Sequence, residues 1–141
     1  DAKLVAENSY MIDEFLAKLN KAGELNLKFS ALDKKILFHG HCHQKSLIGT
    51  AASLEVLNLP ENYKAELINS GCCGMAGSFG FEKEHYDISM QIGEQALFPA
   101  INGSDEQYEI AVMGVSCRQQ VEHGTTRHPR HLAEVLLDAL E

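Results

Sequence analysis

Apolar side chains in the first part of the chain recur every three or four residues, which is typical of an amphipathic helix. The pattern covers residues 4–19, and Gly23 lies where such a helix commonly ends. A weaker alternation of apolar and polar residues over 25–29 permits a short strand. The helical stripe consists of Leu4, Val5, Ile12, Phe15, Leu16 and Leu19.

Further along the chain, strand candidates alternate with helical patterns, and the first of them, 36–38, is a short apolar run. The predicted strands cover 36–38, 64–68 and 110–115, and the predicted helices cover 47–57, 82–97 and 132–140. We expect Ser46 to cap the first of these helices, and Pro99 with Gly103 to end the second. Alternating strands and helices predict an α/β fold, a three-layer arrangement with a mostly parallel sheet and helices on both faces. A length of 141 residues suits one domain, 1–141.

Charge and composition argue against several classes of function. The net charge of −8 and the lack of a basic cluster outside 118–130 argue against nucleic-acid binding. No apolar run approaches the roughly 20 residues that a membrane span needs. No basic and apolar leader opens the chain, so we expect a cytoplasmic protein. The chain begins at Asp1 within a helical pattern, which suggests a piece of a longer polypeptide.

The four cysteines all follow predicted strands. Cys42 follows the first strand, the doublet Cys72-Cys73 the second and Cys117 the third. The carboxyl ends of parallel strands meet at one edge of the sheet, and binding sites form there. Cysteines that stay reduced and cluster in motifs indicate metal binding or catalysis more than cross-linking. We therefore expect the four sulfur atoms to converge at this edge.

The doublet bears on the kind of metal. Four thiolates suit zinc or an iron–sulfur cluster. Structural zinc sites usually take cysteines two to four residues apart, whereas the Cα atoms of adjacent residues lie only ~3.8 Å apart and their side chains diverge. Two adjacent sulfurs therefore reach different irons of a cluster more easily than one ion. A core role for Cys117 and a disulfide within the doublet remain alternatives.

Glycines and histidines beside the cysteines are candidates for contact with the cofactor. Gly74 and its neighbouring glycines permit unusual backbone angles and let amide groups approach cluster sulfur. His41 and His43 flank Cys42, where an imidazole can bind metal, donate a hydrogen bond to sulfur or carry protons. A purely structural role is the alternative for both histidines.

These motifs resemble the second cysteine-rich (CCG) domain of iron–sulfur oxidoreductases. That group includes the B subunit of heterodisulfide reductase, the glycolate oxidase iron–sulfur subunit and the C subunit of anaerobic glycerol-3-phosphate dehydrogenase. The chain is most similar to the C-terminal part of FAD-linked 2-hydroxyacid oxidases of the D-lactate and D-2-hydroxyglutarate dehydrogenase kind, from about Leu4 to Leu140. The motifs are His41-Cys42-His43-Gln44, residues 71–80 (GCCGMAGSFG) and residues 116–120 (SCRQQ).

The resemblance implies an electron-transfer domain whose four cysteines bind an iron–sulfur cluster, expected to be 4Fe–4S. It also implies a flavin dehydrogenase domain or subunit, a preceding cysteine-rich domain and a ferredoxin-like domain as partners, and a cytoplasmic protein held at the inner membrane only through partners. FAD would bind elsewhere in the parent protein, because this chain has no Gly-x-Gly-x-x-Gly motif after a strand. We therefore expect the isolated chain to be inactive on a hydroxyacid.

One position departs from the pattern of the resembled domains. Complete motifs place a fifth cysteine three residues after the one that matches Cys117, and here that residue is Gln120. Four thiolates, a histidine such as His43, or a ligand from a preceding domain would then complete the centre. Two other functions remain open: a structural zinc module that docks to partner domains, and thiol–disulfide chemistry at Cys72-Cys73.

Overall fold

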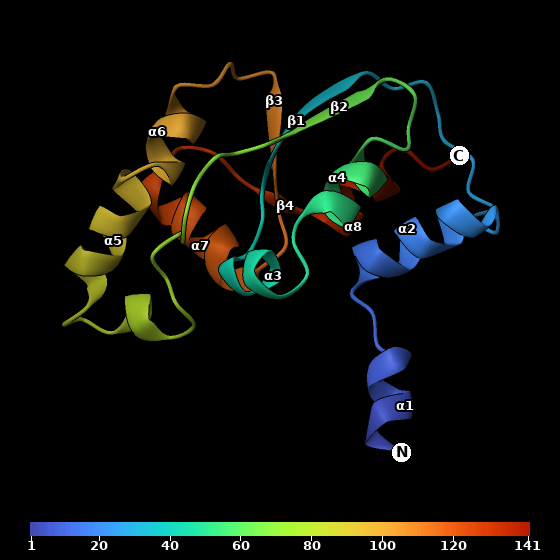
Figure 1. Cartoon of the computed structure of the whole chain (residues 1–141). Helices are drawn as coiled ribbons and strands as arrows, with labels where there is room; N and C mark the ends of the chain where they lie inside the picture. The colour runs from blue at the N-terminus through green and yellow to red at the C-terminus, as the bar shows by residue number, and fades with distance from the viewer.

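Four parallel strands form the centre of the protein, and the computed structural model describes all residues from 1 to 141. The strands lie in the order β2-β1-β3-β4 (Figure 1). Their bounds are β1 Lys34–His39, β2 Tyr63–Leu67, β3 Tyr108–Val112 and β4 Arg130–His131. The parallel sheet that the sequence predicts is thereby confirmed, and β4 is an addition that the apolar pattern did not indicate.

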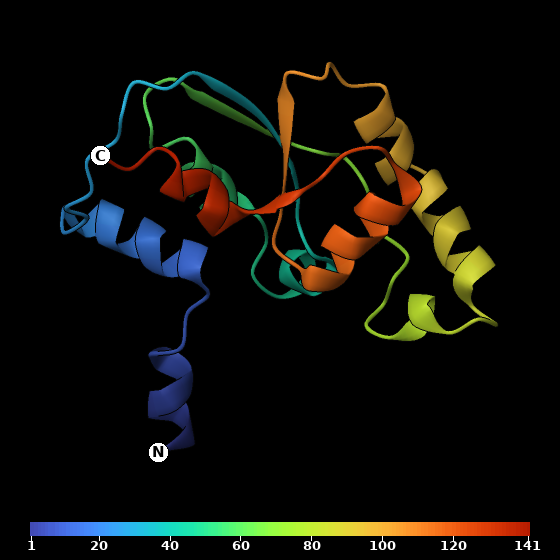
Figure 2. The same cartoon turned by 180° about the vertical axis from the view of Figure 1, so that it is seen from behind.

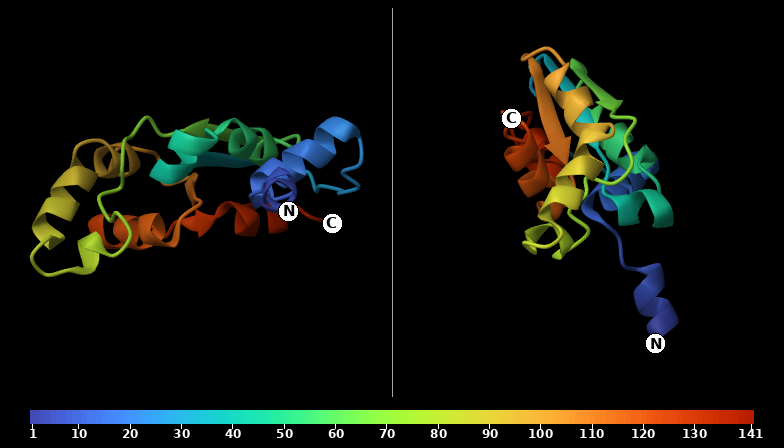
Figure 3. Two further views of the ribbon diagram at one scale, coloured as in Figure 1. Left: turned by 60° about the horizontal axis from the view of Figure 1, so that its bottom comes forward. Right: turned by 90° about the vertical axis from the view of Figure 1, so that its left-hand side faces the viewer.

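Helices cover both faces of the sheet, as predicted. One face carries α2 (Ile12–Ala22), α4 (Ala51–Leu57) and α8 (Leu132–Leu137), and the other side carries α5 (Tyr86–Glu94), α6 (Leu97–Asn102) and α7 (Val115–Gly124). Figure 2 shows α7 and α8 from behind, joined through β4, and the left view of Figure 3 shows the sheet between its helical layers. The short α3 (Cys42–Leu47) lies at the carboxyl edge of the sheet.

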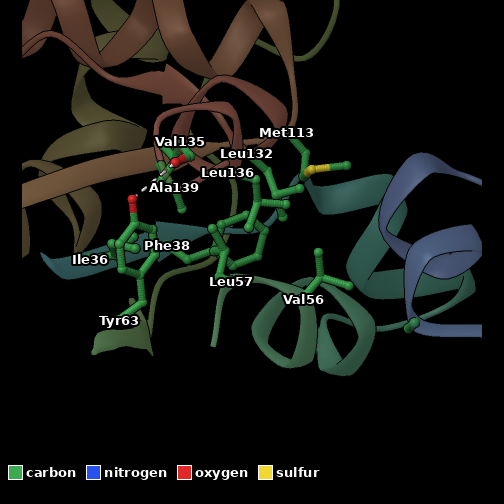
Figure 4. Packing of buried hydrophobic residues seen from close by; sticks show 12 residues of the cluster. Ile36, Phe38, Val56, Leu57, Tyr63, Met113, Leu132, Val135, Leu136 and Ala139 are labelled. Atoms are coloured by element: carbon green, nitrogen blue, oxygen red, sulfur yellow. Dashed lines mark hydrogen bonds between the residues drawn. The ribbon is translucent and has the colours of Figure 1, made fainter. Parts of the chain in front are cut away.

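Strand β1 is buried on both faces and so divides the core into two clusters. Ile36 and Phe38 pack with residues of α4 and α8, whereas Leu37 packs on the opposite side with α6 and α7. Successive strand residues point to opposite faces, so a buried parallel strand needs a continuous apolar run. The first cluster includes one polar contact, a hydrogen bond of 3.4 Å from the Tyr63 hydroxyl to the Val135 carbonyl oxygen (Figure 4).

The predicted helix over 4–19 is broken into two. Helix α1 (Ala2–Glu7) has no buried residue and lies apart from the sheet (Figure 1), and α2 begins after Met11. The Asn8 amide and the Ser9 hydroxyl donate to carbonyl oxygens of α1, and such local bonds compete with a continuing helix. The expected end at Gly23 is confirmed, with φ at +70°.

The predicted helix over 47–57 starts earlier and is interrupted. It consists of α3 and α4, separated at Gly49, whose φ of +77° is incompatible with a right-handed helix. Ser46 lies inside α3, so the expectation that it caps a helix was wrong. The early start has a functional consequence, because it places Cys42 in the first turn of a helix and not in a loop.

Other helix boundaries also differ from the predictions. The pattern over 82–97 corresponds to α5, followed by the separate helix α6, and a short 3-10 helix, η1 (Phe79–Phe81), precedes both. Pro99 lies in the first turn of α6, where its missing amide proton costs nothing, and Gly103 caps the end. Strand 25–29 does not form beyond a single bridge from Phe29 to Leu140, and α7 begins where the third strand was expected to end.

No helix combines the length and the apolar character that crossing a membrane would require.

Candidate metal centre

The structure brings all three cysteine motifs to the carboxyl edge of the sheet. Cys42 opens α3 after β1, the doublet Cys72-Cys73 lies in the loop after β2, and Cys117 lies in the first turn of α7 after β3. In the order β2-β1-β3-β4, the connections leave β1 and β3 toward opposite faces of the sheet. A crevice forms at such a switch point in open α/β sheets, and this is where the sulfurs gather.

The four thiols form two pairs, each with one member of the doublet. The Cys73 and Cys117 sulfurs lie within 4.8 Å of each other, and Cys72 lies near Cys42. The neighbouring Cys117 thiol holds the pKa of Cys73 well below its usual range, and the closeness of Cys73, together with burial, raises the pKa of Cys117. Burial raises the pKa of Cys72. The adjacent side chains therefore diverge toward different partners, as the sequence predicts for a doublet.

Lys45 brings a positive charge to the thiols. Burial lowers the pKa of Lys45. The charges of the four cysteines act in the opposite direction and offset part of this effect. Its Nζ atom donates hydrogen bonds of 2.5 Å to the Ser70 carbonyl oxygen and 3.0 Å to that of Gly71. Lys45 therefore ties α3 to the start of the cysteine loop and lies close enough to the sulfurs to offset negative charge there.

A buried polar network fixes α3 against the helices behind it. The Gln44 amide donates a hydrogen bond of 3.0 Å to Asp13 of α2 and one of 2.7 Å to the Ser53 hydroxyl of α4. The Ser53 hydroxyl in turn donates a hydrogen bond of 2.5 Å to the same carboxylate oxygen of Asp13. All three side chains are buried, so breaking one contact leaves the others unsatisfied. The network holds the helix that carries Cys42 and Lys45 in one position.

Gly74 shapes the loop around the doublet. Its φ of +99° favours glycine, and a Cβ atom there would lie 2.0 Å from the Ser89 carbonyl oxygen. Its amide donates a hydrogen bond of 3.3 Å to the Cys72 sulfur, and the backbone of Met75 helps lower the pKa of Cys73. Backbone amides therefore do approach sulfur in this loop. The Met75 side chain is buried beneath the loop.

His41 and His43 lie beside the thiols and play different local parts. His41 Nδ1 accepts a hydrogen bond of 3.2 Å from the His43 amide and so caps α3. The His41 ring also lies against Gly114, next to Cys117. His43 is exposed, and its ring meets that of His41 edge to face at 5.4 Å. Both rings line an open cleft of roughly 640 Å³ between the start of α2 and α3.

His39 is a residue of the site that the sequence analysis missed. It is the last residue of β1 and is completely buried. One of its ring nitrogens and the sulfurs of Cys73 and Cys117 all lie within 4.8 Å of one another. The ring also helps lower the pKa of Cys73. A polar residue ending an otherwise apolar buried strand, close to Cys42 in the sequence, was the available signal.

Gln120, at the position of the missing cysteine, has a structural role. Its side chain is buried, and its amide nitrogen donates to the Ser89 carbonyl oxygen and hydroxyl, both at 3.0 Å. Ser89 also donates to the Gly74 carbonyl oxygen at 2.9 Å. Gln120 therefore joins α7 to α5 and to the cysteine loop. Its amide is engaged away from the thiols.

The donor set fits a metal centre. Sulfur ligands suit zinc and iron–sulfur clusters, and imidazole suits the same metals. The Nε2 atom of buried His39 has no hydrogen-bond partner, which is costly unless something binds it. The cysteines are all free thiols. The residues that could hold a metal are therefore Cys42, Cys72, Cys73 and Cys117, with His39 beside the last two.

Comparison with known proteins shows relatives among larger dehydrogenases. The C subunit of anaerobic glycerol-3-phosphate dehydrogenase from Escherichia coli (strain K12) is 32% identical over 123 residues, which are 87% of this chain and 30% of that protein. D-2-hydroxyglutarate dehydrogenase of the same strain is 31% identical over 105 residues, 74% of this chain and 10% of the enzyme. The enzyme of that name from Haemophilus influenzae is 41% identical over 70 residues, 47% of this chain and 7% of the enzyme.

This chain thus spans less than a third of the length of the curated relatives that it matches. Both kinds of relative belong to the oxidoreductases that the sequence resembles, and that resemblance is confirmed. No family model and no solved structure matches the chain.

Proposed function

From its homology to D-2-hydroxyglutarate dehydrogenase and to the C subunit of anaerobic glycerol-3-phosphate dehydrogenase, we propose that this chain is an iron–sulfur electron-transfer domain of a larger oxidoreductase. The ligands are the four cysteines, and the expected cluster is of the 4Fe–4S type. Such a cluster supplies one-electron chemistry, with a potential set by hydrogen bonds, charge and exposure.

One observation carries this proposal: the doublet's two sulfurs face different partners. Cys73 lies within 4.8 Å of Cys117, and Cys72 lies near Cys42. Two separate pairs suit a centre with several metal ions, which adjacent cysteines can bridge. They favour neither a disulfide within the doublet nor four sulfurs on one small ion.

The residues of this chain have identifiable tasks in such a site. The Gly74 amide bonds to the Cys72 sulfur, the Met75 backbone acts on Cys73, and both favour the deprotonated form of the thiol. Lys45 lies near all four thiols and offsets part of their negative charge. Met75 and the neighbouring core exclude water beneath the loop. Together these groups stabilise thiolates and tune the potential of whatever metal the thiolates bind.

The larger protein supplies the rest of the proposed reaction. A flavin domain or subunit would oxidise a 2-hydroxyacid, and this domain would pass the electrons onward. A preceding cysteine-rich domain and a ferredoxin-like domain are the other partners that we propose. By itself the domain 1–141 would not turn over the hydroxyacid.

Anaerobic reconstitution with ferrous iron and sulfide tests the proposal. The wild-type domain should gain iron, sulfide and broad visible absorption that bleaches with dithionite. Cys73→Ser should lose this absorption, whereas Ser78→Ala, at an exposed position of the same loop, should keep it. A colourless wild-type protein, or colour that survives in Cys73→Ser at full intensity, would contradict the proposal.

A structural zinc site is the second candidate, because His39, Cys73 and Cys117 alone form a compact group of three donors. Metal analysis of the full-length protein, isolated anaerobically, separates the two. Stoichiometric zinc without sulfide would favour a docking module, and iron with equal sulfide would favour electron transfer.

A further inference from the structure

We infer that His39 is a metal ligand, binding through Nε2 on the side of the centre formed by Cys73 and Cys117. His39 would occupy the coordination position that the fifth cysteine of a complete motif would fill. The inference deepens the proposed function and rests on it for the identity of the metal. The assignment of the ligand rests on geometry alone.

The first observation is an unpartnered buried nitrogen. His39 is completely buried at the end of β1, and its Nε2 has no hydrogen-bond partner. Buried polar atoms in folded proteins almost always have a partner. A buried imidazole nitrogen without a hydrogen-bond partner, beside two thiols, is the arrangement expected of a metal ligand.

The second observation is that the ring's other nitrogen is already held. His39 Nδ1 lies 2.9 Å from the Ser70 hydroxyl oxygen. If Nδ1 carries the proton and donates it to Ser70, the lone pair of Nε2 faces the thiols. Ligating histidines commonly donate the second ring N–H to such a partner, which fixes the tautomer and the orientation of the ring.

Ser70 is itself fixed in place. Its carbonyl oxygen accepts a hydrogen bond of 2.5 Å from Lys45, whose charge lies near all four thiols. One chain of contacts therefore runs from α3 through Ser70 to the His39 ring. These contacts hold the ring where one of its nitrogens lies within 4.8 Å of the two sulfurs.

The other two histidines near the site are less suited to this role. His41 uses Nδ1 to accept from the His43 amide, and His43 is exposed. Neither belongs to a group of donor atoms as compact as that of His39 with Cys73 and Cys117. The structure thus separates His39, as the ligand, from His41, which caps a helix.

Pulsed EPR on the reconstituted and reduced domain, labelled with ¹⁵N-histidine, tests the inference. A strong ¹⁵N coupling should appear in the wild type, disappear in His39→Cys and persist in His41→Asn and His43→Gln. His39→Cys should still bind iron and sulfide, because cysteine offers a thiolate at the same place. A coupling that persists in His39→Cys, or that is lost in His41→Asn, would overturn the inference.

The inference and the proposed function fail in different ways. If iron and sulfide bind but the wild type shows no ¹⁵N coupling, His39 is not a ligand, and the electron-transfer proposal stands. If no iron–sulfur centre assembles, that proposal fails. Whether His39 is a ligand is then tested by adding Zn²⁺ alone to the wild type and recording long-range ¹H–¹⁵N NMR spectra. A shift of His39 Nε2 on binding supports ligation, and an unshifted ring overturns it.

Ser70→Ala provides a milder variant in case His39→Cys does not fold. Loss of the partner that orients the ring should weaken Zn²⁺ binding roughly 10–100-fold, the usual effect of removing such a contact. The control is Ser78→Ala, in the exposed part of the same loop. Equal Zn²⁺ affinity in Ser70→Ala and the control would contradict the inference.

Discussion

At the scale of single residues, charge and backbone geometry decide what the thiols can do. Lys45 lies near enough to all four thiols for their charges to affect its pKa, and its ammonium group is held by the carbonyl oxygens of Ser70 and Gly71. A fixed positive charge beside a metal–thiolate centre favours the state that carries the extra electron. Gly74 has a different role, because it determines the path of the loop that presents Cys72 and Cys73.

Removing the charge of Lys45 should make the reconstituted centre harder to reduce. We expect Lys45→Met to lower the reduction potential by roughly 60 mV, a tenfold change in a one-electron equilibrium. Potentiometric titration measures this shift. Lys64→Met, on the exposed side of β2, should leave the potential unchanged. An equal potential in Lys45→Met and the wild type would show that the ammonium does not act on the centre.

Gly74→Ala should disrupt the cysteine loop. The new methyl would meet the Ser89 carbonyl oxygen at 2.0 Å, and alanine disfavours a φ of +99°. We expect a loss of stability of about 1–3 kcal/mol and a failure to assemble the centre. Gly71→Ala is the matched control, since a Cβ there meets no atom within 4 Å. Equal thermal unfolding and equal iron content in the two variants would refute this account of the loop.

At the scale of elements, the strands β1, β2 and β3 were predictable, and β4 and the helix boundaries were not. The strands β1 and β3 follow from apolar runs, because a strand buried on both faces must be apolar throughout, whereas β2 at the edge of the sheet is largely exposed. The helices instead broke where local contacts competed, as at Asn8 and at Gly49 with its positive φ. Such side-chain bonds and backbone angles leave little trace in an apolar pattern.

A network of ion pairs joins the last helix to the sheet. Asp138, the residue that caps the end of α8, accepts hydrogen bonds from Lys34 of β1 and Arg130 of β4, and both cations also pair with Glu109 of β3. The contact with Arg130, and then that with Lys34, holds the pKa of Asp138 well below its usual range. These contacts connect three neighbouring strands to the end of the chain.

The network predicts a specific dependence of stability on pH. Because the pKa of Asp138 is lower in the folded state, its contribution is complete above the unfolded value of about 4 and is lost as the pH falls through the folded value. Asp138→Asn should therefore cost about 1 kcal/mol at pH 7 and less at pH 3 in urea unfolding. Asp33→Asn, at an exposed site, is the control. The same cost at both pH values would contradict the prediction.

At the scale of the whole molecule, topology assembles the site. The motifs are distant in the sequence, yet parallel strands direct them all to one edge, and the crevice lies between β1 and β3. This convergence follows from the order of strands and could be predicted. The parts played by His39, Lys45 and Gln120 could not, because they depend on side-chain contacts between segments that only the folded chain brings together.

The central claim is that four cysteines share one inorganic centre at this edge. Anomalous diffraction at the iron absorption edge, on crystals of the protein loaded and grown without oxygen, tests it most directly. We predict several iron positions between the two thiol pairs, with every cysteine sulfur bonded to iron. A single ion held by only one pair, or a disulfide between Cys72 and Cys73 without iron, would contradict the account.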